Sequence, residues 1–515
     1  MSTFKKHKFN FKKNKSTFKR DSFKNKLNKY LSTRDDEIFI QYLAAIVAVM
    51  NGNSNPIRSF PDIPSKILGA KIGDAYYVQP WNIETLVNEL LTTPKNLYPG
   101  KRKLSENCFH NFSIINNCLM NLENAEDGLF LNRHDVTYRL PYIAQQQFPW
   151  QWNFKNPRHL YRSIFLYGSG KVGTFFQCQY GISVSKFIMI GFCFFRALSE
   201  LKTIPFYQDM SSLGISESEY NAALSKFSIK LTDAREQAKK IRKPYLHPAY
   251  QPSILRDFPI IAFGQNGERL RAPIPELIAY RYTSGLYLDV VKGDSPVWTE
   301  IGKRFEQYSI EYLAAMMAPY TVEGEKQYGS KSKSYRSPDI LISKSGEIKA
   351  VIECKAKRMN IKSRFPQDVF TDAKTGLDEI AKGIFQLWRF FSHARLGKTT
   401  GIKVDPDCQG ILLTLDSWLV LAPKQREEVF RSANALADKD GNILPEDRRE
   451  IAFCQIEEVE AALEHGTPDN FLDACREISS GEKKGWSLRV EPTDPRPYPF
   501  LDRLKDFLPW LNIEK

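Results

Sequence analysis

The sequence predicts a multi-domain protein in which a mainly helical N-terminal part precedes an α/β part. Its 515 residues are enough for two or three domains that each bury a core. Up to about residue 294 the apolar residues recur mostly at helical spacing, and afterwards helical segments alternate with short runs of period two. We expect four parts: a disordered basic arm over 1–34, a mainly helical domain over 35–294, an α/β domain over 295–480, and an extension over 481–515 that packs on the α/β domain.

The composition is that of an ordinary globular protein, with 42% hydrophobic and 26% charged residues. The densest apolar run, Phe187 to Phe195, has less than half of the ~20 residues that a membrane span needs, so we interpret it as a buried helix. The eight cysteines form no CxxC pair, and the seven histidines have neither HxxxH nor HExxH spacing, which argues against a zinc module. We therefore expect reduced thiols, a cytoplasmic location and no contact with a membrane.

Most of the net charge of +14 lies in the first 34 residues. Twelve Lys or Arg against one acid give +11 there, which leaves +3 for all the rest. Phenylalanines alternate with these cations without helical period, and so little apolar surface predicts disorder in the free arm. Two functions fit: a tail that binds phosphates and stacks on bases, or a solvated tail that aids solubility. The cations expected to bind nucleic acid are Lys5, Lys6, Lys8, Lys12, Lys13, Lys15, Lys19 and Arg20.

Residues 35–294 are predicted to form helices with short β pieces. One helix follows the acids at 35–37, and another follows a serine cap at Ser183 or Ser185. Residues 252–291 predict a strand, a GQNG turn, a strand and a helix. We expect this domain to recognise the substrate or a protein partner. Assembly of the chain into a homo-oligomer through this domain is an alternative.

The stretch FLYGSGKVGTFF contains GxGxxG at Gly168, Gly170 and Gly173. A phosphate-binding loop would need Gly at Phe165 and Ser or Thr at Val172, and no βαβ series surrounds the stretch. We interpret it as a glycine-rich hairpin turn.

The pattern Pro-Asp, a gap, then Glu-x-Lys occurs twice in the sequence, so the motif alone decides nothing. The first copy consists of Asp339, Glu353 and Lys355, and the second of Asp469, Glu482 and Lys484. The second copy surrounds a short helix and a charged loop, where its Glu and Lys would be solvated.

The first copy lies on a predicted hairpin. Asp339 begins the short strand DILIS, SKSG is suited to reversing the chain, and EIKAVIECKAK alternates with period two. The alternation buries one face and puts Glu353 and Lys355 side by side on the other, which we expect to face solvent. The hairpin brings Asp339 and Glu353 towards one point. Two carboxylates held that close repel each other unless a divalent cation lies between them.

These residues and their flanks resemble the PD-(D/E)XK nuclease superfamily, which has the restriction-endonuclease-like fold. The resemblance covers about residues 295–480. Its flanks are an amphipathic helix over 295–317, a helix over 376–395, a fourth strand over 410–422, a helix over 424–436, and a fifth strand with its following helix over 449–463. The order α, β, β, β, α, β, α, β fits the family core, a central mixed sheet flanked by helices.

The resemblance implies a magnesium site, in which Mn²⁺ can substitute. Its ligands would be the carboxylates of Asp339 and Glu353, the main-chain carbonyl of Cys354 and, directly or through water, Glu306. Lys355 would orient the attacking water and stabilise negative charge in the transition state. Gln386 and Lys357 would contact the substrate or the water around the metal.

The sequence therefore predicts a metal-dependent endonuclease that hydrolyses phosphodiester bonds of nucleic acid. Most members of the family that it resembles cut DNA, which favours DNA as the substrate, and nothing in the sequence excludes RNA. A large accessory domain without a helicase or ATPase motif resembles the stand-alone effectors of bacterial restriction and anti-phage (antiviral) defence. The alternative is a non-catalytic nucleic-acid-binding protein with the same fold and the basic arm, and the intact Asp, Glu and Lys set argues against it. A third interpretation is an interaction protein whose C-terminal helix docks a partner. Packing of that helix on its own α/β domain is the simpler explanation.

Overall fold

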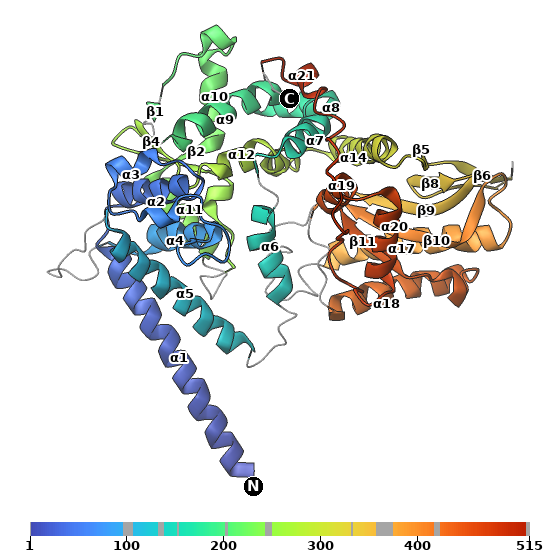
Figure 1. Cartoon of the computed structure of the whole chain (residues 1–515), viewed down its shortest axis with the longest axis horizontal. Helices are drawn as coiled ribbons and strands as arrows, with labels where there is room; N and C mark the ends of the chain where they lie inside the picture. Colours follow the sequence, from blue (N-terminus) through green and yellow to red (C-terminus); the bar gives the residue numbers. More distant parts are fainter. Residues whose placement is uncertain are drawn as a thin grey trace. The chain divides into compact units, whose positions relative to one another are not determined.

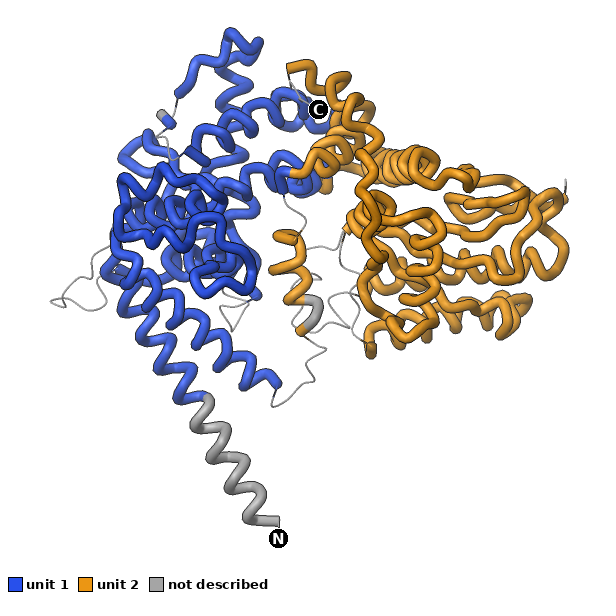
Figure 2. Tube along the Cα trace, viewed as in Figure 1, with its two compact units in different colours: residues 1–136, 153–155, 173–290 blue, residues 137–152, 156–172, 291–515 orange. Residues whose placement is uncertain are grey.

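The structure, a computed structural model, describes residues 2–95, 107–131, 139–151, 154–200, 204–205, 207–242, 250–330, 333–356, 374–416 and 423–510, with backbone alone for 2–16 and 140–141. The chain forms two compact units (Figure 2). Unit 1 comprises residues 1–136, 153–155 and 173–290, and unit 2 comprises residues 137–152, 156–172 and 291–515. A mainly helical N-terminal region is followed by an α/β region, as the sequence predicts.

Unit 1 is built of helices around a small four-stranded sheet of order β1-β4-β3-β2 (Figure 1). Its helices are α1 (Ser2–Ser32), α2 (Asp36–Met50), α3 (Asn55–Ser59), α4 (Pro80–Thr92), α5 (Phe109–Leu131), α9 (Val184–Ser199), α10 (Glu217–Phe227), α11 (Leu231–Arg242), α12 (Glu276–Tyr282) and α13 (Tyr287–Val290). Its strands are β1 (Ile204–Pro205), β2 (Ser228–Lys230), β3 (Ile260–Phe263) and β4 (Arg269–Arg271). Helix α8 (Gly170–Tyr180) spans the boundary between the units.

Several predicted elements of unit 1 are confirmed. Asp35 caps α2 by accepting a hydrogen bond from the amide of Ile38, and Ser183 caps α9. The predicted strand, turn, strand and helix of residues 252–291 appear as β3, β4 and α12. The glycine-rich stretch differs from the expected hairpin, because it is the turn between α7 (Pro157–Tyr167) and α8.

The N-terminal arm is a helix, α1, rather than the disordered segment expected from its composition. Figure 1 shows α1 beside α5, and the two helices pack against each other. Leu27 and Leu31 are fully buried, and Lys24 donates a 2.5 Å hydrogen bond to Glu89 of α4. The buried leucines and this ion pair dock the C-terminal end of α1 on unit 1.

The apolar run Phe187 to Phe195 lies in α9, where Phe187, Ile190 and Phe194 are buried. Among the described residues, no single helix is long and apolar enough to cross a membrane, although α8 and α9, bent by 64°, pass that test as a pair.

Unit 2 is built on a five-stranded sheet of order β11-β10-β9-β8-β5. Its strands are β5 (Thr321–Gly324), β6 (Gln327–Ser330), β7 (Lys333–Arg336), β8 (Ile340–Lys344), β9 (Glu347–Lys355), β10 (Lys403–Thr414) and β11 (Ile451–Gln455). Its helices are α6 (Leu140–Gln151), α7, α14 (Ser295–Met316), α17 (Lys374–Arg395), α18 (Pro423–Asp440), α19 (Ile456–His465), α20 (Pro468–Ser479) and α21 (Leu504–Phe507). Strands β5, β8 and β9 are antiparallel, and β9, β10 and β11 are parallel. The hairpin of β6 and β7 forms a separate two-stranded sheet between β5 and β8 in the chain.

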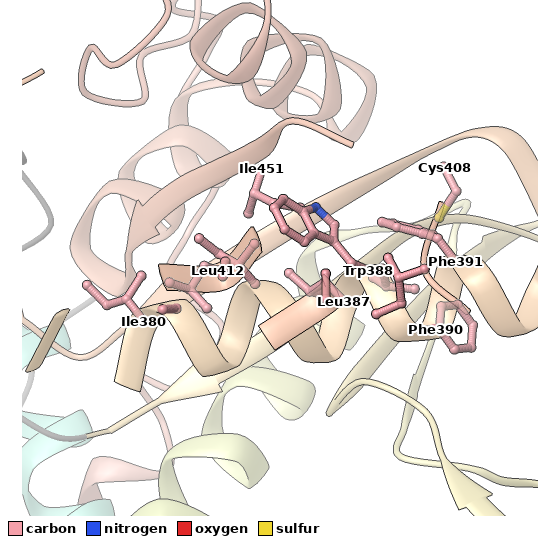
Figure 3. Packing of buried hydrophobic residues seen from close by; sticks show 14 of the residues in the cluster. Ile380, Leu387, Trp388, Phe390, Phe391, Cys408, Leu412 and Ile451 are labelled. Carbon is pink, nitrogen blue, oxygen red and sulfur yellow. The ribbon is translucent and has the colours of Figure 1, made fainter. Parts of the chain in front are cut away.

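The main core of unit 2 lies between the sheet and α17. Figure 3 shows Leu387, Trp388 and Phe391 of α17 packed with Leu412 of β10 and Ile451 of β11. Small residues of α18 extend this core where α17 and α18 pack together. The predicted helices and strands of residues 295–463 are confirmed within the described residues. Positions 417–422 of the expected fourth strand lie outside them, and β10 begins earlier, at Lys403.

One segment predicted for the helical domain belongs to unit 2 instead. The guanidinium of Arg162 in α7 is buried and donates to Glu460 and Glu457 of α19 at 2.6 and 2.5 Å. This pairing fixes α7 against unit 2, so the predicted boundary at residue 294 is interrupted by 137–152 and 156–172. In the C-terminal extension, Tyr498 is hydrogen-bonded to Tyr308 of α14.

Candidate functional site

The candidate site lies at the open end of the β8–β9 hairpin. Ser345 and Gly346 form the two-residue turn with positive φ at both positions, and pairing runs from Lys344 and Glu347 to Ile340 and Ile352. Beyond that last pair, the carboxylate of Asp339 accepts a 2.7 Å hydrogen bond from the amide of Cys354. Asp339 is thereby fixed beside the end of β9.

Glu353 and Lys355 lie on one face of β9 because they are two residues apart in a strand. The ammonium of Lys355 donates to the carboxylate of Glu353 at 2.7 Å and to the side-chain oxygen of Gln386 at 3.3 Å. Gln386 is on α17, so this helix and the strand hold the ammonium from two sides. The structure thus brings four predicted site residues together at the end of β9. They are Asp339, Glu353, Lys355 and Gln386.

The alternation predicts that Glu353 faces solvent, and this prediction is wrong. The side chain of Glu353 is only 3% exposed. The cause is α17, which covers the face of β9 that carries Glu353 and Lys355. At Gly383 of α17, a Cβ would lie 2.6 Å from Leu412, 3.1 Å from Lys355 and 3.5 Å from Glu353. Sequence reasoning missed Gly383, and a glycine inside a strongly helical segment was the available signal for close packing.

Burial and neighbouring charge raise the pKa values of the acids here. Burial, with Asp339 and Glu306 adding to it against the opposing charge of Lys355, raises the pKa of Glu353 to about 7. Burial and the charge of Asp339 raise the pKa of Glu306 on α14 to about 7, and burial raises the pKa of Asp339. Burial lowers the pKa of Lys355, but Glu353 and Asp339 outweigh it and leave that pKa above its ordinary value.

The donor set fits a hard divalent cation in its chemistry. The negative charges of Glu306, Asp339 and Glu353 contribute to the raised pKa values of Glu306 and Glu353. Binding of a cation would lower these pKa values, because it favours the ionised carboxylates. In a strand, the N–H and C=O of one residue point to the same side, so the carbonyl of Cys354 lies on the side where its amide meets Asp339. Among the described residues, no group of three or more His, Cys, Asp or Glu side chains is placed to hold a metal by itself. A cation would therefore need the main-chain carbonyl and water besides the carboxylates.

The other predicted residues are placed less centrally or not described. Lys357 lies outside the described residues, as do the side chains of Lys5, Lys6, Lys8, Lys12, Lys13 and Lys15. Lys19 is exposed on α1, and Arg20 forms a 2.6 Å ion pair with Asp21.

The second copy of the motif does not converge in the structure. Asp469, at the start of α20, contacts Tyr320 and Lys344, and Lys484 pairs with Glu450. Glu482 is exposed. As the sequence context predicts, these residues form no site.

Comparison with protein-family models, curated proteins and solved structures gave no match for this chain.

Proposed function

We propose that this protein is a metal-dependent endonuclease that hydrolyses phosphodiester bonds of DNA. The observation that carries the proposal is the convergence of Asp339, Glu353 and Lys355 at the end of one hairpin, with Lys355 held by Glu353 and Gln386. Acids with raised pKa values next to a fixed cation are typical of a catalytic site.

The architecture of unit 2 supports this proposal. Its elements follow the order α14, β5, β8, β9, α17, β10, α18, β11, which is the order that the resemblance to PD-(D/E)XK nucleases implies, with the β6–β7 hairpin added. The sheet is mixed, with helices packed on it, as the resemblance also implies.

The chain's own groups divide the chemistry between them. Asp339, Glu353, the carbonyl of Cys354 and Glu306 would hold a magnesium ion, which when bound lowers the pKa of a coordinated water and offsets phosphate charge. Lys355 remains protonated because its pKa is raised. Its ammonium, fixed from β9 and α17, can orient the attacking water and stabilise charge that develops on the phosphate oxygens.

Gln386 acts in this mechanism by positioning Lys355. Its side-chain oxygen accepts from the ammonium at 3.3 Å and limits the movement of a long, flexible side chain. A role in bacterial anti-phage defence belongs to the proposal by analogy of architecture only.

The proposal is tested by incubating the pure protein with plasmid DNA, phage DNA, total RNA and tRNA, each with Mg²⁺, Mn²⁺ or EDTA. We expect cleavage of DNA with either metal and none with EDTA. Cleavage of RNA alone would change the substrate. Binding of DNA without cleavage under any metal condition would instead make the chain a non-catalytic DNA-binding protein.

A further inference from the structure

Lysines recur along α1 at alternating spacings of three and four residues. The series comprises Lys5, Lys8, Lys12, Lys15, Lys19, Lys26 and Lys29, and is interrupted only at Ser22. In an α-helix, residues at this spacing share one face. We call this series the lysine ladder.

The described part of the ladder faces solvent. Lys19, Lys26 and Lys29 are all exposed, whereas Leu27 and Leu31 on another side of α1 are fully buried. The thiol of Cys118 in α5 donates a 3.3 Å hydrogen bond to the carbonyl of Phe23, which helps to fix the rotation of α1. The docking of α1 thus leaves these three lysines of the ladder exposed to solvent.

The protein does not neutralise the charges of the three described lysines of the ladder. Lys24, on the docked side, pairs with Glu89, and Arg20 pairs with Asp21. Within the described part of the chain, none of Lys19, Lys26 and Lys29 forms an ion pair with a carboxylate. An anionic partner can therefore meet all three cations without displacing an internal acid.

The spacing of the described lysines and the apolar pattern of α1 indicate which partner. From Lys19 to Lys29 the described lysines span about 15 Å at 1.5 Å per residue, which matches the axial length of about four phosphates on one strand of duplex DNA. An interfacial membrane helix gathers its apolar residues on one face. In α1 they are divided, because Phe18 is 74% exposed while Leu27 and Leu31 are buried.

We propose that the lysine ladder of α1 binds the phosphate backbone of duplex DNA. The inference rests on the proposed nuclease function only for the choice of DNA as partner. Phosphates carry no sequence information, so the ladder contributes affinity and salt dependence but no sequence specificity.

The test compares two triple variants of the full-length protein by fluorescence anisotropy with a labelled DNA duplex, in EDTA and over a series of salt concentrations. One variant carries Lys19→Gln, Lys26→Gln and Lys29→Gln. The control carries Lys71→Gln, Lys239→Gln and Lys240→Gln, which removes the same charge from three exposed lysines elsewhere in unit 1. Circular dichroism checks that both variants are folded.

In the ladder variant, we expect the plot of log K against log salt to be less steep by about 2–3 units of slope. Its affinity for the duplex at low salt should fall about 10-fold or more. The control should keep its slope within about one. Equal losses in both variants, or an unchanged slope in the ladder variant, would overturn the proposal. So would a ladder variant that loses binding to anionic lipid vesicles while it keeps its affinity for DNA. Because binding is measured in EDTA, this result is independent of whether wild-type protein cleaves DNA with metal.

Discussion

The carboxylate of Asp339 is hydrogen-bonded at 2.7 Å to the amide of Cys354, a residue 15 positions further along the chain. The bond continues the β8–β9 pairing two residues beyond Ile352, with a side-chain oxygen in place of a main-chain carbonyl. As a result, Asp339 is held at the start of β8, next to the end of β9 that carries Glu353. The candidate site depends on this relationship.

The first prediction concerns catalysis. Asp339→Asn, Glu353→Gln and Lys355→Met keep similar shapes but remove the charges that the mechanism uses. Each should lower the rate of DNA cleavage by about 100-fold or more, because fixed charges at a reacting centre contribute that much. The measurement is plasmid nicking and linearisation in Mg²⁺.

The second motif copy provides the matched control for these variants. Glu482→Ala with Lys484→Ala also removes one acid and one cation, but from residues that do not converge. This double variant should cleave at the wild-type rate. If this variant lost activity without losing stability, the assignment of the active site to Asp339, Glu353 and Lys355 would be wrong.

The hairpin could be predicted because its signals are local. Alternation in residues 347–355 assigns the two faces of β9, and the SKSG turn sets the register that brings Asp339 near Glu353. The burial of Glu353 could not be predicted, since alternation does not tell which element covers a face. That depends on α17, about 30 residues away, and on the close approach that Gly383 permits.

The second prediction is that unit 2 loses stability as the pH rises from about 5 to about 8 in EDTA. Burial raises the pKa to about 7 for Glu306, Glu353, Glu458 and Glu464. The folded state therefore binds more protons than the unfolded state between about pH 4.5 and 7, so deprotonation favours unfolding. For the buried Glu353 the loss is on the order of 2 kcal/mol.

Thermal melts of wild type, Glu353→Gln and Glu458→Gln over this pH range measure the effect. Each glutamine cannot titrate, so each variant should lose a smaller part of its stability than the wild type does as the pH rises. A melting temperature of Glu353→Gln that falls as steeply as that of wild type would contradict the raised pKa of Glu353.

The third prediction separates metal binding from catalysis by using Ca²⁺ and melting temperature. At pH 8 the acids of the site are ionised and repel one another, so a bound cation stabilises the fold. Ca²⁺ at 10–100 times its dissociation constant should add about 1–3 kcal/mol, or about 1–3 °C in a protein of this size. Glu353→Gln should lose this response, and Glu458→Gln, whose buried glutamate belongs to α19, should retain it. An equal response in both variants would show that the cation binds elsewhere.

The N-terminal helix and α7 show two other limits of sequence reasoning. The composition of residues 1–34 predicts disorder, because total apolar content does not reveal that Leu27 and Leu31 lie together on one side of a helix and become buried. The placement of α7 depends on an ion pair between residues 298 positions apart, Arg162 and Glu460, and no local pattern encodes it.

The buried network around Arg162 is the basis for the last prediction. Its guanidinium meets Glu457 and Glu460, and Glu460 also accepts a 2.5 Å hydrogen bond from Tyr308 of α14. Both Arg162 and Glu460 are almost completely buried. Removing one partner of such a pair leaves a buried charge without compensation, which costs about 3–5 kcal/mol.

Arg162→Met should therefore strongly destabilise unit 2, and the effect should appear as faster hydrogen exchange in α7, α14 and α19. Adding Glu460→Gln should recover part of the loss, because the amide no longer carries the charge that Arg162 neutralised and its oxygen can still accept from Tyr308. Arg196→Met is the matched control, since Arg196 is exposed and its ion pair with Glu200 lies in solvent, so its effect should stay within about 0.5 kcal/mol. A single variant at Arg162 as stable as this control would show that α7 is held in unit 2 by its aromatic contacts, such as that between Tyr161 and Tyr308, and not by the ion pair.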